Sequence, residues 1–163
     1  MEEKRKKRAE YSALFAFIEQ EYDIISKTFT GLDDLLLKKA EELNCHEVRA
    51  EAMYIHDFYN SVENIFKFIA EELNGGIPKG ESWHKTLLIE MKSDIPSIRK
   101  RIISNELYGM LEEILKFRHI VRNSYGIYLK SVRVRKISVI TKKAAEQIKK
   151  EISLFIKNWY KQV

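Results

Sequence analysis

Residues 117–126, Phe-Arg-His-Ile-Val-Arg-Asn-Ser-Tyr-Gly, place several reactive side chains within a few helical turns. Arg118 and Arg122 carry guanidinium groups, which bind the oxygens of a phosphate or a carboxylate through paired hydrogen bonds. His119 carries an imidazole, which exchanges a proton near neutral pH, whereas Asn123 orients a hydrogen bond but carries no exchangeable proton. These residue types are typical of a site that binds an anion and moves a proton.

The apolar residues of this segment fall on one arc at about 100° per residue, which predicts a helix face packed on a core. They are Leu107, Met110, Ile114, Phe117 and Val121. Arg118 and Tyr125 lie at the rim of this arc, so a cation is placed against the core. A buried guanidinium needs a partner, which is either a carboxylate from another helix, with the Tyr125 hydroxyl hydrogen-bonded in the core, or an anionic ligand such as phosphate. The residues alone leave both interpretations open.

Two further histidines, His56 and His84, are candidates to support this site, together with Asp57. Both histidines are far from residue 118 in the sequence, so only tertiary packing brings them near it. Each imidazole also has an ordinary structural interpretation. His56 fits a hydrogen-bonded residue between core aromatics, His84 a polar residue in a first helical turn, and His119 a solvated surface imidazole.

The elements that must position these residues are predicted to be helices, because apolar residues recur at spacings of three and four along the chain. The predicted helices cover about residues 4–28, 30–43, 47–73, 83 to near Pro96, 104–125 and 132–160. Their starts are assigned to capping residues, namely Thr30 with Asp33, Asn44 with Glu47, Ser82 and Ser104. Residues 74–80 hold three glycines and a proline and predict a loop, and Gly126 fits a left-handed helix end. Residues 132–135 alternate like a strand but have no partner, so we expect an all-α bundle of about five to six helices.

Length and composition favour one helical domain over residues 1–163. The chain has 163 residues, of which 45% are hydrophobic and one, Cys45, is a cysteine. A single cysteine excludes an intrachain disulfide and a multi-cysteine zinc site, and we expect no metal and no cofactor. No uncharged run is long enough to span a membrane, and nothing resembles a signal peptide. We therefore expect a cytoplasmic protein that does not bind membranes.

Charge is distributed unevenly along the chain. Residues 1–75 contain 10 Lys/Arg against 16 Asp/Glu, whereas residues 76–163 contain 19 against 8. The basic half predicts an anionic partner. Arg122, Arg133, Arg135 and Lys136 are the candidates for contacts with a phosphate backbone, and the alternative is a solvated helix face.

The segment 117–126 resembles the signature of the HepT-like branch of HEPN-domain ribonucleases. In that signature an arginine, with a polar residue next to it, is separated by four to six positions from a histidine, and a tyrosine stands two residues after the histidine. Arg118, His119 and Tyr125 match it, whereas Asn123 stands in place of the histidine. Residues 54–59 and 75–84 also resemble the central helix and loop of these proteins. The resemblance covers about residues 47–155, which we take as a HepT-like core behind an N-terminal helix at 1–30.

The resemblance implies a toxin-type endoribonuclease that needs no metal and forms a homodimer, with the two signature helices building one cleft. It also implies an antitoxin partner, a small nucleotidyltransferase, that in some systems transfers AMP to the tyrosine of the motif. By position this tyrosine is Tyr125. The modification would add phosphate charge beside Arg118 and compete with RNA for it.

The substitution at Asn123 leaves three hypotheses. In the first, the protein cleaves RNA and another group replaces the histidine; His119 is the nearest candidate on the same helix. In the second, the fold, dimer and basic surface are kept in a non-catalytic module that binds RNA or pairs with a nucleotidyltransferase. In the third, the chain is a structural helical adaptor in which an internal carboxylate saturates Arg118.

Overall fold

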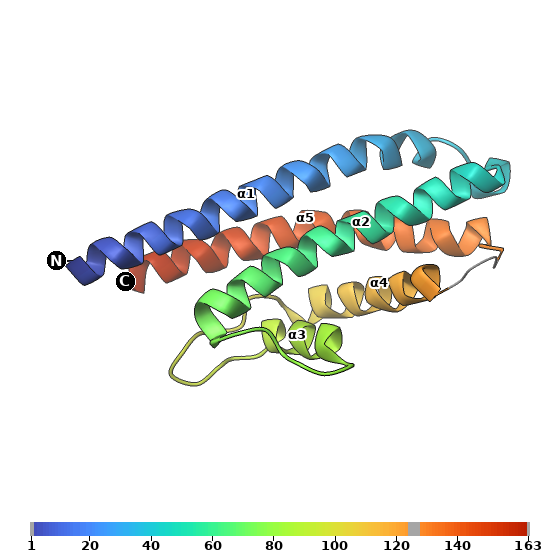
Figure 1. The fold of residues 1–163 in the computed structure, drawn as a ribbon. Helices are drawn as coiled ribbons and strands as arrows, with labels where there is room; N and C mark the ends of the chain where they lie inside the picture. Colours follow the sequence, from blue (N-terminus) through green and yellow to red (C-terminus); the bar gives the residue numbers. More distant parts are fainter. Residues whose placement is uncertain (1, 124–127, 163) are drawn as a thin grey trace.

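The structure is a computed structural model that describes the backbone of residues 2–123 and 128–162, and the side chains of residues 12–123 and 128–159. This part of the chain contains five α-helices, a 3-10 turn and a π-helical turn. In chain order they are α1 (Glu2–Leu36), η1 (Ala40–Glu42), α2 (Cys45–Ile69), η2 (Ala70–Asn74), α3 (Trp83–Lys92), α4 (Asn105–Asn123) and α5 (Ser131–Gln162). The prediction of an all-α bundle is confirmed (Figure 1).

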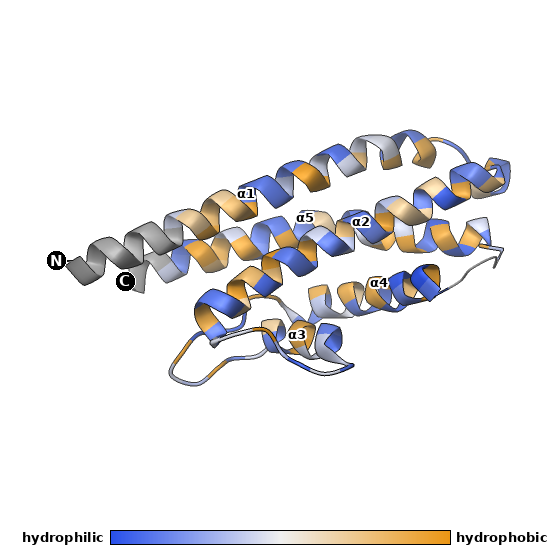
Figure 2. Cartoon of the chain, viewed as in Figure 1, coloured by the Kyte–Doolittle hydropathy of each residue, from blue (hydrophilic) through white to orange (hydrophobic). Residues whose placement is uncertain are grey.

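Helix α2 is the centre of the bundle, because it contacts each of the four other α-helices. The long helices α1 and α5 lie beside it, and α1 begins at the end of the bundle where α5 ends (Figure 1). An apolar stripe of α2 is buried from Ile55 to Ile69. Hydrophobic and hydrophilic residues are interspersed along the coloured parts of the helices, as expected for amphipathic helices that pack in a bundle (Figure 2).

The predicted break near residue 30 is wrong, because α1 runs on to Leu36. The Thr30 hydroxyl donates to the carbonyl of Ser26 in the preceding turn, so it does not cap a new helix. Gly31 is a contact point between helices, since a Cβ there would lie 2.3 Å from the Tyr54 hydroxyl oxygen of α2. The predicted helix at 30–43 is therefore the end of α1 followed by the short turn η1.

The other predicted boundaries agree better with the structure. The Asn44 side chain accepts hydrogen bonds from the backbone of His46 and Glu47, and Glu47 accepts one from Asn44, which completes the predicted capping box. Ser82 precedes α3, but its side chain makes no capping bond. Helix α3 ends at Lys92, before Pro96.

The start of α4 is held against α5. The Ser104 hydroxyl accepts a hydrogen bond from the backbone of Leu107 and donates to Glu151 of α5. Residues 132–135 are helical, so the possible strand is absent there. Gly126 and Tyr125 lie outside the described residues. None of the described helices combines the length and the apolar character that crossing a membrane requires.

Candidate active site around Arg118

Arg118 lies in the interior of the bundle, with only 9% of its surface exposed. Its Nε donates a hydrogen bond of 2.9 Å to the Asn60 side-chain oxygen, and one terminal nitrogen lies 3.9 Å from Glu63 Oε1. The guanidinium carbon also lies 5.8 Å from the centre of the Tyr59 ring, a cation–π distance. Of the two partners that the sequence left open, the carboxylate from another helix is therefore present.

The α-helical repeat of α2 brings the partners of Arg118 together. His56, Asn60 and Glu63 are spaced by four and three residues, so their side chains lie along one face of α2. This face is in contact with α4, which carries Arg118. The helical spacing of Asn60 and Glu63 behind His56 is the sequence signal for these two residues, neither of which was predicted as a site residue.

Glu63 connects Arg118 to a histidine on a third helix. Its Oε2 lies 2.5 Å from Nδ1 of His84, which stands in the first turn of α3. The side chain of Glu63 is 7% exposed and that of His84 is 25% exposed. Arg118 and His84 thus contact the two oxygens of one buried carboxylate.

His56 reaches Arg118 through Asn60. Its Nδ1 lies 3.1 Å from Asn60 Nδ2 and 3.3 Å from Asp57 Oδ1. The amide of Asn60 therefore bridges the imidazole of His56 to the guanidinium of Arg118. Tertiary packing brings both predicted support histidines into one cluster with Arg118.

Tyr59 is an aromatic residue of this cluster. Burial raises the pKa of its hydroxyl well above the ordinary value of 10.0, and the nearby carboxylate of Glu63 raises it further. The phenol is therefore neutral at physiological pH. Its ring supplies an aromatic face to Arg118.

His119 and Asn123 lie away from this cluster, on the exposed face of α4. Asn123 Nδ2 is 3.1 Å from His119 Nε2, so the two side chains contact each other one turn apart. Arg122 is exposed as well. The structure therefore separates the predicted residues into a buried group around Arg118 and an exposed group around His119, while Tyr125 lies outside the described residues.

A family model described as HepT-like protein matches residues 50–159, more than half of the chain. The matched stretch contains every residue of the cluster. The chain belongs to the HepT-like family. The comparisons with curated proteins and with solved structures gave no match.

Among the predicted phosphate-binding residues of this HepT-like protein, some are exposed and one points into the bundle. Arg133 and Lys136 are exposed on α5. Arg135 points inward, where its Nε donates a 2.8 Å hydrogen bond to the fully buried Glu51. Its terminal nitrogens also donate to the carbonyls of Leu35, in the last turn of α1, and of Lys38, just after this helix. Arg135 thus joins α1, α2 and α5, and we remove it from the set of proposed RNA contacts.

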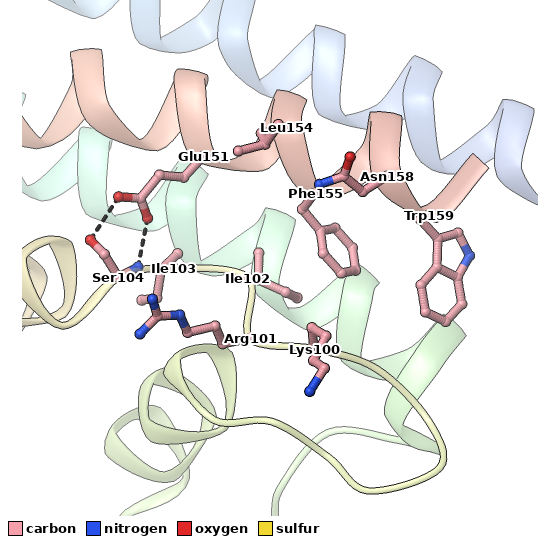
Figure 3. Close-up of a pocket in the computed structure, with 10 residues that line it drawn as sticks. All are labelled: Lys100, Arg101, Ile102, Ile103, Ser104, Glu151, Leu154, Phe155, Asn158 and Trp159. Carbon is pink, nitrogen blue, oxygen red and sulfur yellow. Dashed lines mark hydrogen bonds between the residues drawn. The ribbon is translucent and has the colours of Figure 1, made fainter. Parts of the chain in front are cut away.

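Two cavities lie at opposite ends of α4. One of about 390 Å³ is formed by the C-terminal half of α4 and the start of α5, with Phe117, Lys130 and Arg133 in its lining. A cavity of about 500 Å³ lies between residues 100–104 and the end of α5, where Phe155 and Trp159 face the loop (Figure 3). No predicted site residue lines the cavity of Figure 3. Within the described residues, no three His, Cys, Asp or Glu side chains converge as a metal site.

Proposed function

We propose that this HepT-like protein is the RNA-directed toxin component of a toxin–antitoxin pair and acts as a metal-independent endoribonuclease. The observation that carries the proposal is the cluster around Arg118, in which one guanidinium is joined to two imidazoles through Asn60 and Glu63. A buried cation beside proton-carrying groups is the combination that phosphodiester cleavage requires without a metal.

The reaction that fits these residues uses the ribose 2′-hydroxyl as the nucleophile. A base must remove its proton, an acid must protonate the leaving 5′-oxygen, and a cation must stabilise the negative charge that develops on phosphorus. Arg118 is the cation in this proposal. Its three protein contacts fix the guanidinium before substrate binds, so little reorganisation is needed in the transition state.

RNA approaches the site in this proposal along the basic surface formed by Arg122, Arg133 and Lys136. All three side chains are exposed. Arg133 also lines the cavity beside the C-terminal half of α4, which links the basic surface to the signature helix. Contacts of this kind bind the phosphate backbone and do not read base sequence.

The proposed assembly is a cytoplasmic homodimer whose two signature helices form one cleft, and the proposed partner is a nucleotidyltransferase antitoxin. Tyr125 is the proposed acceptor of AMP. A phosphate there would compete with the RNA phosphate for Arg118. These proposals rest on the family, since partner and modification are known features of the proteins that the chain resembles.

The test is cleavage of labelled single-stranded RNA and transfer RNA by the purified protein in the presence of EDTA. Wild type is expected to produce fragments ending in a 2′,3′-cyclic phosphate. Arg118→Ala should lower the rate by about 10²–10³-fold, because one preorganised charge stabiliser is removed. Arg49→Ala, which removes an exposed arginine at the other end of α2, should cleave like wild type. No cleavage by a folded wild-type protein would refute the ribonuclease.

A second candidate function is a catalytically impaired HepT-like homodimer that binds RNA or serves as a nucleotidyltransferase partner. Asn123 favours it, because its amide does not take up a proton near neutral pH and contacts His119 on the exposed face of α4. Asn123→His distinguishes the two functions. A large gain of RNA cleavage over an inactive wild type supports the impaired module, whereas a robust and unchanged rate supports the active ribonuclease.

A further inference from the structure

We propose that His84 is the proton-transfer residue of this site and that Glu63 is its positioning residue. The inference rests on the proposed ribonuclease activity and names the group that replaces the missing motif histidine. It is carried by one juxtaposition, in which the carboxylate of Glu63 holds His84 of α3 on one oxygen and Arg118 of α4 on the other.

The contact between Glu63 and His84 sets the state of the imidazole. A carboxylate accepts hydrogen bonds, so Nδ1 of His84 must carry the hydrogen in this 2.5 Å contact. In the neutral ring Nε2 is then the lone-pair nitrogen that can accept a proton. A buried carboxylate behind an imidazole orients the ring.

The exposed fraction of the side chain is larger for His84 than for the two residues behind it. The side chain of His84 is 25% exposed, whereas those of Arg118 and Glu63 are 10% and 7% exposed. The carboxylate is therefore inside the bundle and the imidazole is at its surface. This arrangement fits a role in which His84 contacts the substrate and Glu63, shielded from solvent, holds the imidazole in place.

The other histidines lack this arrangement. His119 contacts Asn123 on the exposed face of α4, and His46 is exposed at the start of α2. His56 contacts Asp57, but that carboxylate is half exposed, at 50%. Among the four histidines, all of which the structure describes, the contact with a buried carboxylate belongs to His84.

The proposed step balances as a transesterification. The proton of the 2′-hydroxyl moves to Nε2 of His84 while O2′ forms a bond to phosphorus. The bond between phosphorus and O5′ breaks, O5′ keeps the electron pair and takes a proton from water, and Arg118 stabilises the charge on the non-bridging oxygens. The products are a 2′,3′-cyclic phosphate and a 5′-hydroxyl, and His84 then returns its proton to water.

The experiment compares His84→Gln and His84→Ala with wild type in the RNA cleavage assay with EDTA. Glutamine keeps a donor for Glu63 but cannot take up a proton, so His84→Gln should fold normally and lose about 10²–10⁴-fold in kcat. Added imidazole should restore part of the rate of His84→Ala. His46→Ala serves as the matched control and should keep the wild-type rate.

The role of Glu63 has its own readout. In ¹⁵N-labelled protein, the ring-nitrogen shifts of His84 should show the Nδ1–H tautomer, and Glu63→Gln should reduce its population and lower kcat more than it raises KM. The proposal is overturned if His84→Gln cleaves at the wild-type rate while Arg118→Ala is inactive, a result that leaves the ribonuclease standing. Failure of wild type to cleave any RNA would overturn both.

Discussion

At the scale of single residues, the carboxylate of Glu63 determines how the reactive groups are arranged. It stands on α2 and contacts His84 of α3 and Arg118 of α4. Among the described residues, neither His84 nor Arg118 has a second carboxylate within salt-bridge distance. Glu63 therefore joins the acid–base group of the proposed reaction to its phosphate-binding group.

The ion pair between Arg135 and Glu51 predicts a stability effect. Arg135→Met leaves a fully buried carboxylate without its partner, so the free energy of unfolding should fall by about 3–5 kcal/mol. The double variant Glu51→Leu with Arg135→Met should recover part of this loss, because no buried charge is left. Urea unfolding monitored by circular dichroism measures both effects. Equal stability of wild type and Arg135→Met would contradict this role.

Sequence reasoning located Arg118 against the core because helical periodicity fixes the direction of a side chain on its own helix. Its partners could not be assigned that way, since Asn60 and Glu63 depend on how α2 packs on α4. The environment of Arg135 could not be predicted from its own helix either. It looked like one charge of a basic run, and only the crossing of α1, α2 and α5 shows that its guanidinium is turned inward.

At the scale of elements, helix ends follow local rules only where no other helix intervenes. The capping box at Asn44 formed as predicted, because both of its partners lie in the same turn. The predicted box at Thr30 failed because Gly31 lets α2 approach and Leu32 is fully buried, so continuing α1 preserves packing. Tertiary contact there outweighs a local capping preference.

Removal of the Asn44 side chain that caps α2 is expected to reduce the stability of the protein modestly. Asn44→Ala should lower the free energy of unfolding by about 1 kcal/mol, because two backbone N–H groups lose their acceptor. Asn105→Ala, at an exposed position at the start of α4, is the matched control and should change stability by less than about 0.5 kcal/mol. Thermal unfolding of the two variants gives the comparison, and equal losses would argue against the capping role.

The loop between α3 and α4 predicts a pH effect. The backbone N–H of Arg101 and the ammonium of Lys100 hold the pKa of Asp94 below its ordinary value of 3.8. A lowered folded-state pKa contributes stability above the unfolded pKa, and this contribution disappears as pH falls through the folded value. Wild type should therefore be more stable than Asp94→Asn near about pH 6, and the difference should vanish in acid. A difference that grows on acidification would contradict the assignment.

At the scale of the whole molecule, the acidic and the basic half of the chain form different helices. The acidic half supplies α1 and α2, and the α2 carboxylates Glu51 and Glu63 contact arginines of the basic half inside the bundle. The surplus of cations over residues 76–163 includes the exposed Arg133 and Lys136 on α5. The uneven charge of the sequence thus serves both internal pairing and the proposed RNA surface.

Binding of RNA should depend on salt in proportion to these exposed cations. Reversing Arg133 and Lys136 to glutamate should reduce the slope of log affinity against log salt by about 1.4, since each phosphate contact on a single strand contributes about 0.7. Reversal of Lys27 and Lys79, which lie on α1 and in the loop before α3, is the matched control of equal charge change. Fluorescence anisotropy across a salt series measures both slopes, and identical slopes would exclude α5 from the RNA path.

The most direct test of the account is a double-mutant cycle on RNA cleavage with Arg118→Ala and His84→Gln. If Glu63 joins the two residues into one catalytic unit, kcat/KM of the double variant should be no more than about threefold below that of the slower single variant. Independent roles would make the two losses multiply. Multiplying losses, or a wild-type protein that leaves RNA intact, would contradict the account.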